Sequence, residues 1–385
     1  MNKSGQHIVI AIPCLNRGGT EMQTLNLVRA LSQGGYRLST VCYFENDDEV
    51  VAEFRAAGTE VLLMNCERST GAFALISKLK KQFRRLKPDV VHVQYMAPGA
   101  LPIVAARLAG VTRVLATVHQ PYTRSHGLKA KVLLRLSATM CSRFICVSQN
   151  AEKSWFGSGA LYNHQLSLRK QAAHFTIYNA VDVSAIQQIK SDTNPHQLRE
   201  ALGIPAESII VGAVSRLTYE KGIDVLIQAF AQAREKEPLL HLLIVGTGAE
   251  EATLKQQAAQ LQADKQLTFY GKADWQKAMK LMALMDVVVV PSRFEGFGLT
   301  AAEAMAMGKP VIASNVYGLK EVVTDGHTGW LFDSNDTKVL CEQLIKISRQ
   351  APIRSHLGQQ SFSYCFQNFD ITVFTQQIRA LYSSL

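Results

Sequence analysis

The sequence lacks any apolar run approaching the roughly 20 residues that a membrane-spanning helix needs. Its most apolar stretches, residues 8–15 and 287–290, have the length of strands. Its first residues hold one lysine and no small-residue cleavage site behind the apolar run, which argues against a secretory signal. The seven cysteines are dispersed, and the nearest pair, Cys141 and Cys146, has no histidine close by in the sequence. We therefore expect a soluble cytoplasmic protein with buried thiols and no metal site.

Strand-length runs alternate with helical patterns along all 385 residues, of which 47% are hydrophobic and 19% charged. The expected strands are residues 8–15, 38–44, 60–64, 90–95, 114–119 and 144–148, then 209–215, 242–246, 267–270, 287–291, 310–313 and 330–332. A polar stretch over residues 182–195 separates the two sets and predicts a hinge. We predict an α/β chain of two Rossmann-like doubly wound parallel-sheet domains, residues 1–185 and 186–385. They are expected to face across a cleft, with the last helix able to pack back on the first domain.

Charge is distributed unevenly between these halves. Residues 1–185 hold 22 Lys and Arg against 11 Asp and Glu, whereas residues 186–385 hold 19 against 20. The net charge of +10 therefore belongs to the first half. This asymmetry predicts an anionic partner such as a membrane surface, a phosphorylated substrate or nucleic acid, although a solvated basic surface would look the same.

The first half offers two candidate loops. Gly18 and Gly19 lie between the first strand and a helix predicted to begin near Met22, where backbone amides attract phosphate. Neither a Walker lysine nor a dinucleotide fingerprint accompanies this glycine pair, so a plain tight turn is the alternative. His119 stands at the last position of the strand over residues 114–119, facing the expected ligand edge, or it is a structural histidine.

The second half offers a carboxylate pair behind a buried strand. Glu295 precedes Gly296 and Gly298, a helix is predicted from Leu299, and Glu303 falls one turn inside that helix. Carboxylates accept hydrogen bonds from the paired hydroxyls of a sugar or ribose, while amides at a helix start take phosphate oxygens. The two carboxylates are expected to converge on one ligand. Alternatively, Glu303 stabilises its own helix and Glu295 is solvated.

Two cations follow the strand over residues 209–215. Arg216 and Lys221 are placed to clamp a diphosphate, or to form a surface ion pair with Glu220. Gly246 and Gly248 form another tight turn after a strand, without the third glycine of a dinucleotide fingerprint.

These segments together resemble the retaining glycosyltransferases of family 4, which have the GT-B architecture. The resemblance covers nearly the whole chain and rests on Gly18-Gly19-x-Glu21, His119, Arg216 with Lys221-Gly222, and Glu295-x7-Glu303. Its most specific parts are residues 295–310, 318–321 and the glycines at 326 and 329. The chain departs from the family pattern at Ser215, at Thr247 and over residues 178–182.

The resemblance implies a role for each candidate residue. Glu303 would hold the donor ribose, Glu295 the transferred sugar, and His119 would lie near that sugar and the leaving phosphate. Arg216 and Lys221 would neutralise the diphosphate, helped by Gly246 and by amides of Phe297, Gly298, Leu299, Gly18 and Gly19. The implied reaction moves a hexosyl or N-acetylhexosaminyl group, with retention, from a nucleoside-diphosphate sugar to a saccharide or lipid-linked saccharide. No metal or other cofactor is expected.

The biological setting that the resemblance implies is bacterial lipopolysaccharide, capsule or exopolysaccharide synthesis. UDP is the first expectation for the donor nucleotide and GDP the second. A nucleotide-sugar epimerase or phosphorylase of the same architecture, a basic nucleic-acid-binding protein and a dinucleotide oxidoreductase are the alternatives. The nucleic-acid alternative lacks zinc, helix-turn-helix and single-strand-binding signatures, so we expect no nucleic acid.

Two basic segments predict peripheral attachment to the cytoplasmic face of an anionic membrane. The first is an amphipathic helix with an apolar stripe of Phe73, Ile76, Leu79, Phe83 and Leu86 and the cations Lys78, Lys80, Lys81, Arg84, Arg85 and Lys87. The second set is Arg124, Lys129, Lys131, Arg135 and Arg143.

Overall fold

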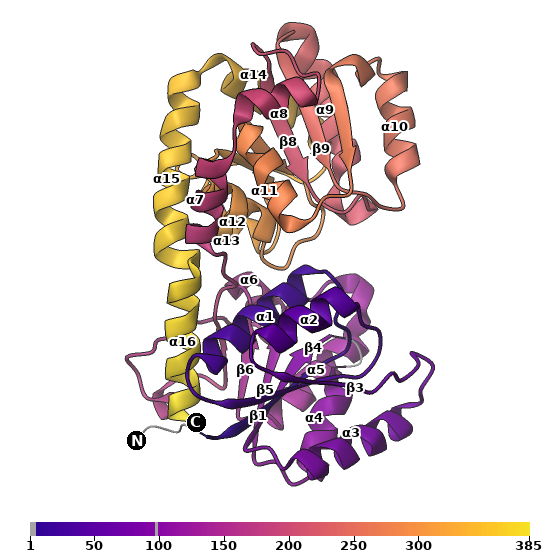
Figure 1. Ribbon diagram of the computed structural model, residues 1–385, viewed down its shortest axis with the longest axis vertical. Coiled ribbons are helices and arrows are strands. Elements are labelled where there is room, and N and C mark those ends of the chain that lie inside the picture. The colour runs from indigo at the N-terminus through magenta and orange to yellow at the C-terminus, as the bar shows by residue number, and fades with distance from the viewer. Residues whose placement is uncertain (1–4, 97–98) are drawn as a thin grey trace. The chain divides into compact units, whose positions relative to one another are not determined.

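The computed structural model describes residues 5–96 and 99–385 and divides into two units, each an open parallel sheet covered by helices (Figure 1). The N-terminal unit contains residues up to Ala180 together with Ile371–Leu385, and the C-terminal unit is Val181–Asp370. The chain thus changes unit a few residues before the expected boundary at 185/186, and its last helix belongs to the N-terminal unit.

The N-terminal sheet has the strand order β3-β2-β1-β4-β5-β6-β7, with every recorded pair parallel. Its strands are β1 His7–Ile12, β2 Arg37–Cys42, β3 Glu60–Leu63, β4 Val90–Tyr95, β5 Arg113–Val118, β6 Arg143–Cys146 and β7 His174–Thr176. The edge strand β7 was not expected from the sequence, because it is three residues long and preceded by a polar loop. The others lie within a few residues of the predicted ranges.

Helices cover both faces of this sheet. They are α1 Gly19–Ser32, α2 Asp48–Ala56, α3 Ala72–Leu86, α4 Ala100–Leu108, α5 Gly127–Thr139, α6 Gln149–Phe156 and α16 Ile371–Ser384, with short 3-10 turns η1 Arg124–His126 and η2 Leu168–Lys170. Strand β1 shows why both faces are buried: Ile8, Ile10 and Ile12 pack on one core with α1 and α16, and Val9 and Ala11 pack on the other with α3 and α4. The C-terminal helix α16 runs beside α1 (Figure 1).

The C-terminal sheet has the order β10-β9-β8-β11-β12-β13, again parallel throughout the recorded pairs. The strands are β8 Ile209–Val214, β9 Leu240–Val245, β10 Leu267–Gly271, β11 Val287–Val290, β12 Val311–Ser314 and β13 Gly329–Phe332. The helices are α7 Val183–Asp192, α8 Pro195–Ala201, α9 Ile223–Lys236, α10 Glu251–Gln260, α11 Trp275–Leu284, α12 Leu299–Ala306, α13 Leu319–Val322, α14 Thr337–Arg349 and α15 Ala351–Phe369, with the turns η3 Tyr219–Lys221 and η4 Asp264–Gln266.

Three local features differ in detail from what the sequence suggests. The polar stretch 182–195 is mainly helical, because Asp182 caps α7 and Asn194 caps α8, which has Pro195 in its first turn. The first helix begins at Gly19 and not near Met22. Helix α3 packs four residues of the expected apolar stripe against the core, namely Ile76, Leu79, Phe83 and Leu86. The fifth, Phe73, is 91% exposed, and Leu75 is buried instead.

The described cysteines are all free thiols, and six of the seven are buried, Cys141 being half-buried. Among the described residues, no helix is both long and apolar enough to cross a membrane.

Candidate functional site

The centre of the C-terminal sheet is a topological switch point. Strand β8 is followed by β9 on one side, and β11, its neighbour on the other side, is followed by β12 and β13 further out. Because the loops after β8 and β11 leave the same sheet edge in opposite directions, side chains from both loops meet at the carboxyl ends of these strands. A pocket lies at this point, lined by residues of the two strands and by Lys221, Ser292, Glu295 and Thr300.

Lys221 and Glu295 form an ion pair in this pocket. The Lys221 ammonium donates to a carboxylate oxygen of Glu295 at 2.6 Å, and each side chain is about one-fifth exposed. Lys221 was expected to join Arg216 in a diphosphate clamp or to pair with Glu220, so its bond to Glu295 is a contact that the sequence did not predict. The structure therefore joins two predicted site residues that lie far apart in the chain.

Gly222 is the residue that permits this contact. It has φ of +63°, and a Cβ atom there would lie 2.1 Å from the carbonyl oxygen of Pro291 at the end of β11. Any side chain would force the loop after β8 away from the loop after β11. The glycine thus places Lys221 against the segment that carries Glu295.

The loop after β11 is fixed by another cation. Arg293 donates two hydrogen bonds to the carboxylate of Asp224 on α9, at 2.8 and 2.7 Å, and its guanidinium lies 4.1 Å from the centre of the Tyr219 ring. The bonds to Asp224 raise the pKa of Arg293. Sequence inspection missed Arg293, because its partner lies on a distant helix.

Arg216 has a different setting from Lys221. Its side chain is exposed, makes no recorded hydrogen bond among the described residues and does not line the pocket. The Arg216 guanidinium is therefore exposed on the loop after β8.

Glu303, on α12, is half-buried and accepts a hydrogen bond from Nε1 of Trp275 on α11 at 2.8 Å. Burial raises the pKa of Glu303 to about 7, and the Trp275 hydrogen bond opposes that rise. Glu303 does not line the pocket that holds Glu295, and the two carboxylates have different partners. The two carboxylates therefore share no partner among the described contacts, and their convergence on one ligand stays a prediction.

The start of α12 presents free backbone amides. Gly298 precedes the helix with φ of +109°, and a Cβ there would lie 2.6 Å from Leu319. The first amides of a helix have no acceptor within it, so those of Leu299, Thr300 and Ala301 are available to an anion. Gly246 is equally constrained, with φ of +133° and its Cβ position 1.9 Å from the carbonyl oxygen of Ser215.

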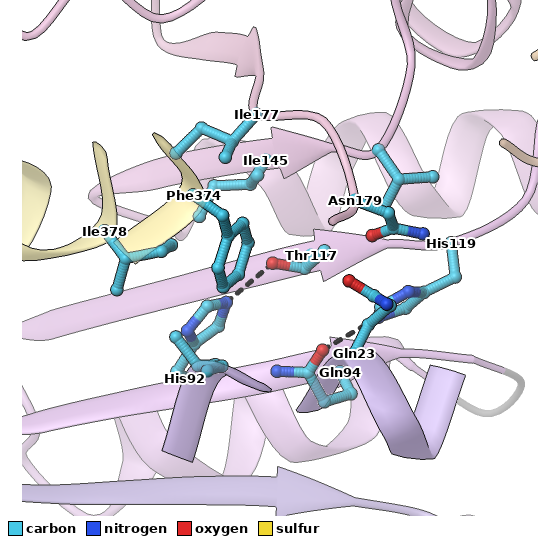
Figure 2. A pocket seen from close by; sticks show the side chains of 12 residues that line it. Gln23, His92, Gln94, Thr117, His119, Ile145, Ile177, Asn179, Phe374 and Ile378 are labelled. Atoms are coloured by element: carbon cyan, nitrogen blue, oxygen red, sulfur yellow. Dashed lines mark hydrogen bonds between the residues drawn. The ribbon is translucent and has the colours of Figure 1, made fainter. Parts of the chain in front are cut away.

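In the N-terminal unit, a second pocket gathers uncharged polar side chains. Figure 2 shows Gln23 from α1, Gln94 from β4, His119 and Asn179 lying close together, with Phe374 and Ile378 of α16 on the apolar side. His119 follows the last residue of β5 rather than ending the strand as predicted. Its Nε2 lies 2.8 Å from Oε1 of Gln94.

Two polar atoms of this pocket lack a partner among the described residues: Nδ1 of His119 and Nε2 of Gln94. Gln94 is only 1% exposed, so its amide group is withdrawn from bulk water. A buried donor or acceptor without a partner is costly, and such groups favour a ligand that completes their hydrogen bonds. Burial lowers the pKa of His119 to about 4, so its ring is neutral at physiological pH.

His92 lies deeper in the same pocket. Its Nδ1 is 2.6 Å from the hydroxyl of Tyr382 on α16, and its Nε2 is 2.7 Å from the hydroxyl of Thr117 (Figure 2 draws the second contact). Burial lowers the pKa of His92 to about 3. Sequence inspection missed His92 and Gln94, although two polar residues alternating within the apolar strand β4 were a usable signal.

The glycine pair of the first loop has an acidic neighbour. Gly18 and Gly19 stand at the start of α1, and a Cβ on Gly18 would lie 2.5 Å from a carboxylate oxygen of Glu21. Glu21 is 6% exposed and accepts a hydrogen bond from the Cys14 thiol. This buried carboxylate counteracts the attraction of the helix start for a phosphate.

The chain matches two family models. "Glycosyltransferase Family 4" matches residues 17–157, and "Glycosyl transferases group 1" matches residues 195–363. Among the described residues, no group of three or more His, Cys, Asp or Glu side chains is arranged to hold a metal ion.

Characterised proteins resemble the chain over most of its length. It is 30% identical over 294 residues to a GDP-mannose-dependent monoacylated alpha-(1-6)-phosphatidylinositol monomannoside mannosyltransferase of Corynebacterium glutamicum, covering 71% of each chain. It is 27% identical over 314 residues to the N-acetyl-alpha-D-glucosaminyl L-malate synthase of Bacillus anthracis, covering 80% of this chain and 78% of the relative. The crystal structure of Anabaena HepE in complex with UDP and glucose has the same fold, with a TM-score of 0.80 over 98% of this chain and 99% of that one, at 22% identity.

The fold and these matches define an enzyme that acts on sugar nucleotides. The chain belongs to the glycosyltransferases of GT-B type.

Proposed function

We propose that the chain is a retaining family 4 glycosyltransferase that transfers a hexosyl or N-acetylhexosaminyl group from a nucleoside-diphosphate sugar to a saccharide or lipid-linked saccharide. The observation that carries the proposal is the Lys221–Glu295 pair in the pocket at the switch point of the C-terminal sheet. A diphosphate needs a cation and free amides, and a sugar needs a carboxylate acceptor. These groups lie on the loops after β8 and β11 and at the start of α12.

The ion pair is compatible with a bound donor. An ammonium group carries three N–H donors, of which Glu295 takes one, so Lys221 can also donate to diphosphate oxygens. In transfer, the bond between the anomeric carbon and the donor phosphate oxygen breaks, and a bond from that carbon to the acceptor hydroxyl oxygen forms on the same face. The proton of the acceptor hydroxyl passes to a phosphate oxygen of the nucleoside diphosphate, which leaves with the bonding electron pair. Lys221, exposed Arg216 and the α12 amides stabilise the charge that develops on it.

The nucleotide ribose is assigned to Glu303. Its Oε1 is engaged by Trp275, and a carboxylate has further acceptor sites for the two ribose hydroxyls. We expect UDP before GDP, and no metal ion, because side-chain cations and amides are available to the diphosphate.

The pocket of the N-terminal unit is assigned to saccharide hydroxyls. The unpartnered atoms of His119 and Gln94 are uncharged, which suits a neutral ligand. His119 is placed near the transferred sugar, and Gly18 and Gly19 are assigned to backbone contacts with the donor, against the opposing charge of Glu21.

The setting proposed is lipopolysaccharide, capsule or exopolysaccharide synthesis, with the protein in the cytoplasm or peripheral on the cytoplasmic face of the inner membrane. The Corynebacterium glutamicum relative, a phosphatidylinositol monomannoside mannosyltransferase, supports a lipid-linked acceptor. The basic charge of the first half supports an anionic surface.

Calorimetry with UDP and with uridine tests the donor site. UDP is expected to bind at least about tenfold more tightly, because only UDP engages Lys221, Arg216 and the amides. A panel of nucleotide sugars is then screened for turnover, and proton NMR of the product reports whether the anomeric configuration is retained. Equal affinity for UDP and uridine would contradict the diphosphate site, and an inverted product would contradict retention. Interconversion of two nucleotide sugars without transfer would favour the epimerase alternative.

A further inference from the structure

Helix α5 of the N-terminal unit, which Figure 1 labels, carries several exposed apolar side chains. Leu128, Val132, Leu133 and Leu136 are 76, 55, 53 and 61% exposed, a concentration that no other described helix reaches. The side that α5 turns toward the unit holds the buried Leu134. A surface helix of a soluble protein normally shows the reverse pattern, with polar residues outward. The exposed apolar side chains of α5 are therefore of the kind that a binding partner covers.

The spacing of the exposed residues makes one stripe. Leu128, Val132 and Leu136 are separated by four residues each, so they lie on one side of the helix, and Leu133 widens that side. Exposed Lys129 and Arg135 flank the stripe. We call the four apolar residues together with these two cations the α5 face.

Every charged side chain in the surrounding sequence is positive, histidines aside. Residues 90–151 contain no Asp or Glu and seven Lys or Arg, three of them within α5. Two of those three also fix the helix to the unit, because Lys131 lies 4.6 Å from the centre of the Tyr122 ring and Arg135 donates to the carbonyl oxygen of Trp155 at 2.8 Å. These two contacts attach the helix that carries the α5 face to the rest of the unit.

Helix α3 provides the contrast. It carries more cations than α5, but its apolar residues Leu75, Leu79 and Phe83 are buried in the unit, and Phe73 alone is strongly exposed. Apart from Phe73, such a helix can attract an anionic surface only through charge. The α5 face combines charge with apolar area that is free to leave water.

We infer that the α5 face lies in the headgroup region of an anionic lipid bilayer, with its leucines in the acyl boundary and its cations at the lipid phosphates. This deepens the membrane association proposed above by naming the inserting surface, and it does not depend on the transfer reaction. Charge favours lipid over a second copy of the chain, because pairing two α5 faces brings Lys129 and Arg135 of both copies together. Anionic headgroups instead neutralise these cations.

The test is co-sedimentation of the intact protein with vesicles of equal parts phosphatidylglycerol and phosphatidylcholine, compared with vesicles of phosphatidylcholine alone. The wild type is expected to bind the mixed vesicles and the L128Q/L136Q variant at least about tenfold less tightly, because two apolar side chains no longer enter the bilayer. The matched control is L239Q/L261Q, which replaces two exposed leucines of the C-terminal unit and is expected to bind like the wild type.

A fluorescent reporter separates insertion from simple charge attraction. In an L136W variant, the added indole emission is expected to shift to shorter wavelength with the mixed vesicles and not with phosphatidylcholine alone. Failure of the wild type to bind the mixed vesicles, or equal binding by wild type and L128Q/L136Q, overturns the inference. So does a concentration-dependent dimer that L128Q/L136Q dissociates, since a second copy then covers the face. UDP affinity is measured in parallel for L128Q/L136Q, so a failed donor site is distinguished from a failed membrane face.

Discussion

The sheets of the two units have the same order for their first six strands, numbered along the chain within each unit. The loops at the carboxyl ends of these strands nevertheless carry side chains of opposite chemistry in the two units. Counted within each unit, both sheets run third, second, first, fourth, fifth, sixth strand, and the N-terminal sheet adds a seventh at the end. In the C-terminal unit, the loops at this edge bring together the charged pair Lys221 and Glu295. In the N-terminal unit, the pocket holds histidines, glutamines, an asparagine and a threonine without a charge, since burial keeps His92 and His119 neutral.

This difference shows that topology selects where a ligand binds and loop residues select which ligand. Parallel strands with the same order direct their carboxyl-end loops to the same place in both units. The charged pocket suits a phosphorylated donor and the neutral pocket a saccharide. The following predictions test whether that division is real.

The largest effect is expected from removing both cations of the C-terminal loop after β8. Replacing Arg216→Ala and Lys221→Ala together is expected to lower the transfer rate by about 100-fold or more, because charge on the leaving diphosphate loses its stabilisation. Initial rates and a thermal melt are measured on the same samples. The control is Lys265→Ala, an exposed cation of the same unit. Near-normal turnover in the double variant would contradict the assignment of the charged pocket to the phosphorylated donor.

The Glu303 carboxylate is expected to contribute next. Glu303→Ala should weaken UDP binding by about 1 to 3 kcal/mol through lost ribose hydrogen bonds. Because the pKa of Glu303 is about 7, UDP affinity should rise as pH increases from 6 to 8 and the carboxylate ionises. Calorimetry across that pH range checks both effects. Glu303→Gln should flatten the pH dependence of UDP affinity. An unchanged pH dependence in this variant would contradict the contact between Glu303 and the nucleotide.

Glycines at the two loops are expected to differ in tolerance. Gly222→Ala should destabilise the C-terminal unit by about 2 kcal/mol or more, because positive φ and the close Pro291 carbonyl both oppose a Cβ atom. Gly18→Ala should cost less, since Gly18 has an extended backbone and only the carboxylate end of Glu21 must shift. Urea unfolding measures both. A larger loss of unfolding free energy for Gly18→Ala than for Gly222→Ala would contradict the view that the loop after β8 depends more strongly on its glycine.

Within one pH unit of pH 6.5, the smallest effect is the pH dependence of the stability of the N-terminal unit. The pKa of His92 is about 3 in the folded protein and 6.5 for an ordinary histidine. Between pH 3 and pH 6.5, His92 therefore binds a proton in the unfolded chain but not in the folded one. Stability should therefore be constant above pH 6.5 and fall by about 1.4 kcal/mol per pH unit below it from His92 alone. His92→Leu should reduce this slope in urea unfolding, whereas Tyr382→Phe should lower stability and keep the slope. Identical slopes in all three proteins would contradict a buried neutral His92.

Much of the fold was accessible from the sequence, because buried parallel strands are short apolar runs. All the predicted strands exist, and the range predicted for β4 is the observed one, Val90–Tyr95. The errors fall at boundaries and polar segments. Residues 182–195 look like a linker by composition, but Asp182 and Asn194 cap helices there. The three-residue strand β7 has too few residues to show a pattern.

The candidate site was accessible in part. The residue types after β8 and β11 indicated an anionic sugar ligand, and the pocket at the switch point contains Lys221 and Glu295 as predicted site residues. Their mutual ion pair, the Trp275 bond to Glu303 and the Arg293–Asp224 pair depend on side chains that are distant in the sequence. No local pattern indicates such contacts, so the sequence could suggest only near neighbours, such as Glu220 for Lys221, as partners.

The sequence by itself determined the alternation of strands and helices, the basic first half and the chemistry available on each loop, because periodicity and residue type are local properties. Only the tertiary structure decided which of those groups meet, which are buried enough to change protonation, and which leucines of α5 remain uncovered. The physical reason is that burial and contact depend on packing between distant segments, and packing acts on the folded chain as a whole.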